Sequence, residues 1–99
     1  MASTIERLRE SLDPQTVSNA IYGLMLEWVH AYLELVTLLA PDGRLRAEVR
    51  GKQSTRRLTL KVRLYEQVLA SLFGVEPETI REFLLEHYEI KEIPKWHAS

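Results

Sequence analysis

The residues of this sequence best suited to chemistry are basic, because eight of its thirteen lysines and arginines fall within residues 44–63. They are Arg44, Arg46, Arg50, Lys52, Arg56, Arg57, Lys61 and Arg63. Only Glu48 opposes them in that segment. The flanking segments each carry a net charge of −4: two basic against six acidic residues in 1–43, and three against seven in 64–99. Arginine and lysine bind phosphates, so the segment predicts an anionic partner, with nucleic acid as the first candidate.

No other pattern predicts catalysis or a metal site. The chain has no cysteine, which excludes a cysteine nucleophile and thiolate ligands. His30 lies between Glu27 and Glu34 at helical spacing, which is typical of an exposed helix face. His87 and His97 have no partner at metal-ligand spacing. We therefore expect neither an enzyme nor a cofactor.

The size and composition of the chain predict one domain, residues 1–99. Its 99 residues, 45% of them hydrophobic, are enough for one small core and too few for two. The sequence has no apolar run of signal-peptide length at its start and none of the roughly 18 residues needed to span a bilayer. These features predict a cytoplasmic location and no membrane partner.

Residues 4–40 are predicted to be helical, as a short helix over 4–11 followed by a long one. Asp13 and Pro14 are typical of a helix start, and Pro41 with Gly43 ends the second pattern. The long helix is apolar over most of its circumference, so it must be covered on several sides. It is therefore predicted to be a central core helix, a dimer interface, or both, and we expect a homodimer built on it.

Residues 44–63 change to a period of two, which predicts a basic β-hairpin. Apolar and charged residues alternate in both "RLRAEVR" and "RLTLKVR", and "GKQSTR" fits the connecting loop. Pairing Arg50 with Arg57 puts the apolar residues on one face and the cations on the other. Like charges directly opposite are destabilising, which favours an anionic partner. The rival interpretation is one helix over residues 54–73.

Residues 65–88 are predicted to form two short helices around a glycine turn. The stretch "YEQVLASLFGVEPETIREFL" has a small Ala70 where the helices cross, Gly74 in the turn and Pro77 at the second helix start. It resembles the helix-turn-helix superfamily of DNA-binding domains over residues 65–84. That resemblance implies that the second helix enters the major groove, with Arg81 as its basic contact. The alternative is a packed helix pair that does not touch DNA.

The sequence thus predicts an α+β fold, mostly helical: a short helix, a long apolar helix, a basic β-hairpin and a helix-turn-helix-like pair. A tail over residues 89–99 follows, docked by Ile90, Ile93 and Trp96. The predicted function is a small nucleic-acid-binding regulator or accessory protein, using the eight basic residues and Arg81. The alternatives are a dimeric interaction module with an acidic protein partner, and a basic face that only matches acidic helices of its own chain or of a second subunit.

Overall fold

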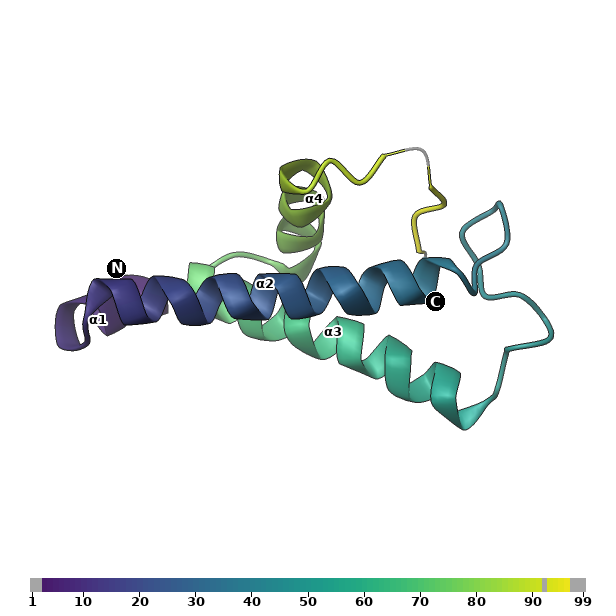
Figure 1. The fold of residues 1–99 in the computed structure, drawn as a ribbon, viewed down its shortest axis with the longest axis horizontal. Helices are drawn as coiled ribbons and strands as arrows, with labels where there is room; N and C mark the ends of the chain where they lie inside the picture. Colours follow the sequence, from purple (N-terminus) through teal and green to yellow (C-terminus); the bar gives the residue numbers. More distant parts are fainter. Residues whose placement is uncertain (1–2, 92, 97–99) are drawn as a thin grey trace.

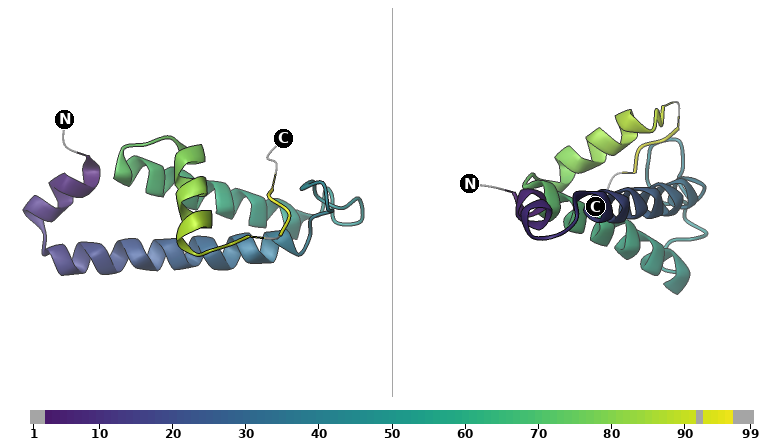
Figure 2. Two further views of the ribbon diagram at one scale, coloured as in Figure 1. Left: turned by 90° about the horizontal axis from the view of Figure 1, so that it is seen from above. Right: turned by 60° about the vertical axis from the view of Figure 1, so that its left-hand side comes forward.

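The computed structural model describes residues 3–91 and 93–96, in which four helices form an elongated body of 48 × 27 × 22 Å. The helices are α1 (Thr4–Ser11), α2 (Pro14–Val36), α3 (Gln53–Phe73) and α4 (Pro77–His87). Helices α2 and α3 lie side by side and antiparallel, and α4 crosses over them (Figures 1 and 2). Helix α1 lies at one end of the body, and the loop that joins α2 to α3 lies at the other.

The helix starts follow from capping residues in the sequence. The Ser3 hydroxyl accepts a hydrogen bond from the Glu6 backbone N–H at 3.2 Å, and the Asp13 carboxylate accepts one from Thr16 N–H at 2.9 Å. Pro14 occupies the first turn of α2 and Pro77 that of α4, where the missing N–H costs nothing. The starts predicted for these two helices are confirmed.

The predicted β-hairpin over residues 44–63 is wrong, and with it the α+β fold class. Residues 47–51 form turns and residues 53–63 belong to α3, so the rival interpretation, a helix over 54–73, describes this segment. Within residues 3–91 and 93–96, the one β contact is an isolated antiparallel bridge between Leu39 and Leu45. Helix α2 also ends at Val36 rather than at Ala40, because the chain turns back through that bridge.

The hairpin interpretation fails because residues 53–73 satisfy a helical period over a longer range. No glycine or proline interrupts the segment, and most of its residues favour helices. Val62 and Leu69 are fully buried on the side that faces α2, and Leu58 packs against the same core. The helix leaves Leu60 62% exposed and Leu64 57% exposed. A two-residue period would place both leucines on the inner face.

The core lies between α2 and the other helices, so most of the apolar surface of α2 is covered within one chain. Eight α2 residues are buried: Val17, Ile21, Met25, Trp28, Val29, Ala31, Tyr32 and Leu35. Leu69 and Ala70 from α3, Ile80 and Leu84 from α4, and Ile5 from α1 meet them. None of the helices in the described part of the chain is long and apolar enough to cross a membrane.

The turn between α3 and α4 depends on a left-handed glycine. Gly74 ends α3 with φ 73°, ψ 35°, as its place in the sequence predicts, and its N–H donates to the Ala70 carbonyl. A Cβ at Gly74 would lie 3.6 Å from Ser3 Cβ, which is ordinary contact. Backbone conformation, rather than a clash, therefore restricts this position to glycine.

We predict that Gly74→Ala lowers the free energy of unfolding by about 1 kcal/mol, because alanine is strained at positive φ. The matched control is Gly23→Ala in α2, where a Cβ meets nothing within 4 Å. That change should raise stability by about 0.5–1 kcal/mol, since alanine is the better helix former. Urea denaturation measures both, and equal effects of the two substitutions would contradict the left-handed turn.

Candidate functional site

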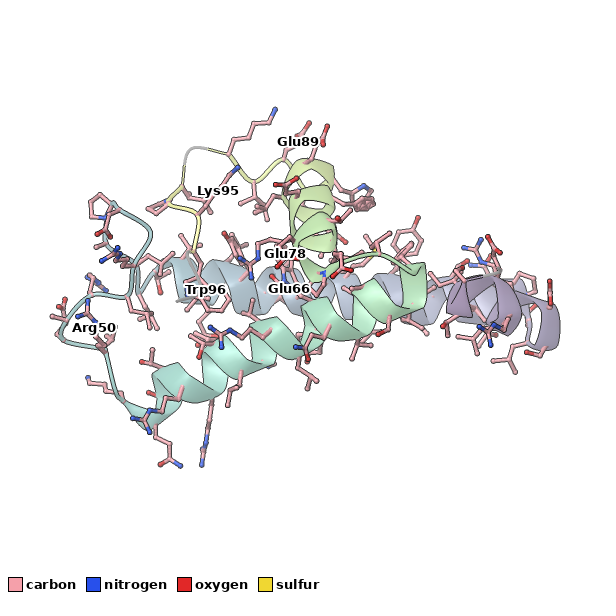
Figure 3. All side chains as sticks on the ribbon, turned by 180° about the vertical axis from the view of Figure 1, so that it is seen from behind. Arg50, Glu66, Glu78, Glu89, Lys95 and Trp96 are labelled. Atoms are coloured by element: carbon pink, nitrogen blue, oxygen red, sulfur yellow. The ribbon has the colours of Figure 1, made fainter. Side chains whose placement is uncertain are left out.

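The eight basic residues predicted from residues 44–63 are distributed over the loop between α2 and α3 and the N-terminal half of α3, and they do not form a hairpin. Arg44, Arg46 and Arg50 belong to the loop between α2 and α3, where Figure 3 labels Arg50. Lys52 is the N-cap of α3, and the other four lie in its first half: Arg56, Arg57, Lys61 and Arg63. All eight are exposed. We call this group the basic end.

Two residues of the basic end also shape the loop. Arg46 donates to the Thr37 carbonyl at 2.8 Å, at the C-terminus of α2, and lies 3.7 Å from Glu48. Arg50 donates to the Leu45 carbonyl at 2.9 Å. A cation at a helix C-terminus is favoured by the helix dipole, so Arg46 stabilises the end of α2. These contacts fix part of the loop that joins α2 to α3.

The first turn of α3 adds positive potential to the basic end. Its N-cap, Lys52, makes no side-chain capping hydrogen bond, and the turn contains no acidic residue. The free N–H groups of a helix N-terminus carry partial positive charge, and Lys52, Arg56 and Arg57 occupy the N-cap and the following turns at this end of the helix. Within one chain this arrangement is unfavourable, and an anion bound there would relieve it.

Arg81 does not join the basic end, because it forms a buried ion pair between α4 and α3. Its Nε lies 2.8 Å from Glu66 Oε2 and its Nη2 lies 2.6 Å from Glu66 Oε1. The Glu66 side chain is 3% exposed and that of Arg81 is 22% exposed. This bidentate geometry is the strongest form of the interaction between arginine and carboxylate. Arg81 therefore serves the fold.

The ion pair is the centre of a wider polar network that reaches α2 and the tail. Trp28 Nε1 donates to Glu66 Oε2 at 2.9 Å, so this carboxylate accepts three hydrogen bonds. The Arg81 Nη1 donates to the Trp96 carbonyl at 3.4 Å, and the Trp96 N–H donates to the Tyr32 hydroxyl at 3.2 Å. Trp28 and Tyr32 are stacked, with ring centroids 4.7 Å apart. Glu66 and Trp96 are labelled in Figure 3.

The predicted docking of the tail is confirmed for the residues that the structure describes. Trp96 is 5% exposed, and Ile90 and Ile93 pack against the core. The Arg81 and Arg63 guanidinium carbons lie 5.0 Å and 5.2 Å from the centroid of the Trp96 ring. Cation–π attraction therefore links the tail to the basic end through Arg63.

Two pKa values are shifted by this network. Hydrogen bonding to the Glu66 carboxylate raises the pKa of Arg81 above its already high ordinary value, so Arg81 stays charged. Burial raises the pKa of Tyr32 above its ordinary value of 10.0, although the hydrogen bond that its hydroxyl accepts from Trp96 N–H acts in the opposite direction. Both shifts favour the protonation states that the network uses at neutral pH.

The helix-turn-helix-like pair corresponds to the last turns of α3 and the whole of α4. The two helices and the glycine turn lie where the sequence predicts them, although α3 begins at Gln53. The exposed residues of α4 include Glu78, Glu82 and Glu86. Figure 3 places Glu78 and Glu89 on α4 and its exit, away from Arg50 and the loop. In this arrangement α4 presents negative charge where a DNA-reading helix needs positive charge.

The described residues contain no group of three or more histidine, cysteine, aspartate or glutamate side chains that could hold a metal ion. Comparison of the chain with protein-family models, curated proteins and solved structures finds no significant match.

Sequence reasoning missed the Glu66 network because it depends on the helical frame of α3. In that frame Val62, Glu66 and Leu69 share one side of the helix, so a carboxylate interrupts the apolar row. A buried carboxylate requires a cationic partner. This signal becomes visible only when residues 53–73 are taken as one helix.

We predict that Glu66→Gln lowers the free energy of unfolding by about 3 kcal/mol, because it leaves Arg81 half-buried without its carboxylate. The control is Glu48→Gln, which makes the same chemical change in a side chain that is 66% exposed. That substitution should cost less than about 0.5 kcal/mol. Urea denaturation near pH 7 measures both. If Glu66→Gln lowered the free energy of unfolding no more than Glu48→Gln does, the ion pair would not be important for stability.

We also predict that Tyr32 contributes to loss of stability at alkaline pH. Its pKa is raised in the folded state, so folding favours the neutral phenol. That contribution is fully present below the unfolded pKa of about 10 and is lost as pH rises through the folded pKa. The free energy of unfolding, taken from denaturation curves at several pH values between about 8.5 and 11, should fall less steeply with pH in Tyr32→Phe than in the parent chain. The same dependence on pH in both proteins would contradict the raised pKa of Tyr32.

Proposed function

We propose that this protein binds nucleic acid through its basic end, as a small regulator or an accessory protein of a nucleoprotein assembly. The observation that carries the proposal is the gathering of eight exposed cations on the loop and the first half of α3. A cytoplasmic location and self-association as a homodimer are parts of the same proposal. The proposed contacts lie on the loop and on a helix instead of the predicted hairpin. Arg81 is not among them, because it forms an ion pair with Glu66.

Charge balance within the chain supports an external anion. Two acidic residues, Asp42 and Glu48, lie in the same loop as part of the basic end, and Asp42 already accepts a hydrogen bond from the Arg44 backbone N–H. Among the described residues, the ion pairs are Arg46 with Glu48 and Arg81 with Glu66. The carboxylates of α4 therefore do not neutralise the basic end by direct pairing. A repeating phosphate backbone offers ligands for several of these cations at once.

The contacts proposed are to phosphates, so they position the protein on a nucleic acid without reading its sequence. Arginine is well suited to this task because its planar guanidinium can donate two hydrogen bonds to one phosphate. Lys52, Arg56 and Arg57 lie at the N-cap and in the following turns of α3, where the first backbone N–H groups add further donors. DNA and RNA both supply the required anion.

A second candidate function is a protein-interaction module, an adaptor or inhibitor with no nucleic-acid contact. It is favoured by an apolar surface at the opposite end of the body, where α2, α3 and α4 meet. Tyr22, Phe73 and Phe83 are 57%, 39% and 42% exposed there, around a cavity of about 210 Å³. Exposed aromatic groups beside a small cavity are typical of contacts that anchor a protein partner. Such binding would depend little on salt.

We predict that labelled duplex DNA, single-stranded DNA or RNA binds the protein with strong salt dependence. Phosphate contacts release counterions, so affinity measured by fluorescence anisotropy should fall at least about tenfold between roughly 50 and 200 mM salt. The double variant Arg44→Glu with Arg56→Glu should weaken binding at low salt. It should also reduce the slope of log affinity against log salt by about two.

The control variant is Arg7→Glu with Lys91→Glu, which changes the net charge by the same amount on α1 and on the tail. If net charge alone governed binding, both double variants would lose equal affinity, and the basic end would not be the site. No binding to any of the three nucleic acids at low salt would instead favour the protein-interaction module.

A further inference from the structure

The first half of α3 carries an exposed leucine with a pair of cations on each side. Leu60 is 62% exposed, the largest exposed fraction among the large hydrophobic residues that the structure describes. At 3.6 residues per turn, two cations lie roughly 40–60° to one side of Leu60 and two lie roughly 60–100° to the other. The first pair is Arg56 and Arg63, and the second is Arg57 and Lys61. All four are exposed, so Leu60 has a basic edge on each side.

No exposed carboxylate of α3 opposes these cations. The acidic residue of this helix, Glu66, is 2% exposed and forms its ion pair with Arg81. Leu64 follows Leu60 one turn later and is 57% exposed. This face of α3 is therefore apolar along its centre and positive along both edges. A ligand that matches it has two rows of negative charge with apolar groups between them.

The first half of α3 projects from the body. Figures 1 and 2 show α4 on one side of α2 and the first turns of α3 on the other, with no helix over their outer side. Figure 3 shows the same half of α3 diverging from α2 as it approaches the loop. An α-helix with its side chains is about 10–12 Å across. A projecting helix of this size can enter a groove of similar width.

We propose that the first half of α3 enters the major groove of duplex DNA, an inference that rests on the proposed function and names its ligand. The major groove of B-DNA is about 12 Å wide and admits an α-helix. Arg56 and Arg63 bind phosphates along one edge of the groove, and Arg57 and Lys61 bind those along the other. Leu60 faces the base edges between them, where the 5-methyl group of thymine is the apolar surface.

Duplex RNA and single strands fit this face less well. The major groove of A-form RNA is deep and narrow, so side chains do not reach its base edges. Proteins bind single strands largely by stacking bases on aromatic side chains. Residues 53–64 contain no aromatic residue. The combination of leucines and paired cations therefore favours duplex DNA.

An anionic membrane surface matches only part of the helix. The apolar row continues to Val68, 38% exposed, where the exposed neighbours Gln67 and Ser71 are uncharged. A helix that lies on a bilayer is rich in lysine and arginine along its polar face. The cations of this chain continue in the other direction, beyond the start of α3, at Lys52 and Arg50. A DNA backbone that runs past the end of the helix meets them there.

One of the four cations is held in place by the tail. The Arg63 guanidinium carbon lies 5.2 Å from the centroid of the Trp96 ring. Trp96 is 5% exposed, and its backbone N–H donates to the Tyr32 hydroxyl at 3.2 Å. A side chain that is ordered before binding loses less conformational freedom when it contacts a ligand. Trp96 is thus a positioning residue for the Arg63 edge of the groove-binding face.

The resemblance to helix-turn-helix domains implies that α4 enters the groove, whereas the charges of the two helices favour α3. The exposed residues of α4 include Glu78, Glu82 and Glu86, which DNA phosphates repel. The first half of α3 has four exposed cations and no acidic residue. We therefore assign groove binding to α3.

The first experiment compares duplex DNA, duplex RNA and single-stranded DNA of one sequence by fluorescence anisotropy at about 100 mM salt. Duplex DNA should bind at least about tenfold more tightly than duplex RNA, because the B-form major groove admits the helix. Equal affinity for all three, with a steep salt dependence, would overturn groove binding and leave phosphate binding at the basic end intact. No binding to any of them, even at about 50 mM salt, would overturn both.

A second experiment tests the contact of Leu60 with thymine. Leu60→Ala keeps every charge and should leave the fold intact, because Leu60 is exposed. Replacing thymine by uracil in an A·T-rich duplex removes only the 5-methyl groups. Each change should weaken binding about fourfold, the effect of returning one methyl group to water. Both changes together should weaken it little more than either alone, since they remove the same contact.

The matched control is Leu26→Ala, which shortens a leucine of α2 that is 48% exposed. It should bind both duplexes as the parent chain does. Independent, fully additive effects of Leu60→Ala and of uracil, or no effect of either, would overturn the contact between Leu60 and the bases.

Two single variants test whether both edges of α3 bind phosphates. Arg56→Ala and Lys61→Ala should each reduce the slope of log affinity against log salt by about one. Lys91→Ala, which removes an exposed cation of the tail, should leave the slope unchanged. An effect confined to one edge would overturn the groove geometry. Sedimentation of the parent chain with vesicles of phosphatidylglycerol and phosphatidylcholine, lost in Leu60→Ala and without a preference for duplex DNA, would assign the face to lipid instead.

Discussion

The Glu66 carboxylate, almost completely buried on α3, is the group on which the arrangement of the other elements depends. It accepts hydrogen bonds from Trp28 on α2 and, twice, from Arg81 on α4. A carboxylate removed from water is strongly unfavourable unless its partners are complete. Any packing that placed α2, α3 or α4 in another register would leave this charge unpaired. The network therefore selects one relative position of the three helices, which apolar contacts alone would specify less strictly.

The same interaction decides where positive charge is left for a partner. Arg81 is the cation of α4, and its pairing with Glu66 leaves that helix with a negative exposed surface. Trp96 is held between Arg81 and Arg63, so the tail covers the network and approaches the basic end. The molecule thus has an acidic middle around α4 and positive charge at the loop end. This separation is the physical basis of the proposal that an anionic partner binds at the loop end.

Local signals predicted part of the fold correctly. The caps at Asp13 and Pro14, the left-handed Gly74 and the helix start at Pro77 each act within a few residues, so the sequence contains them directly. The eight basic residues of segment 44–63 are evident from composition, and the structure leaves all eight exposed. The first half of α3 was assigned to a hairpin, with the helix only as the rival interpretation, because the alternation over residues 57–63 fits a strand. The hydrogen-bond partners of Glu66 and Trp96 could not be predicted for a different reason: they lie 15 to 64 residues away in the chain.

The conflict that misled the hairpin prediction has a physical meaning of its own. A helix that served only its own core would place polar residues at positions 60 and 64, because exposed leucines there add nothing to the stability of the monomer. Their presence gives α3 two apolar faces, one satisfied by α2 and one open. In natural sequences the local propensity, the apolar pattern and the core packing tend to favour the same structure, except where function imposes another demand. In residues 57–68 two apolar periods overlap: the inner one builds the fold, and the outer one leaves Leu60, Leu64 and Val68 exposed.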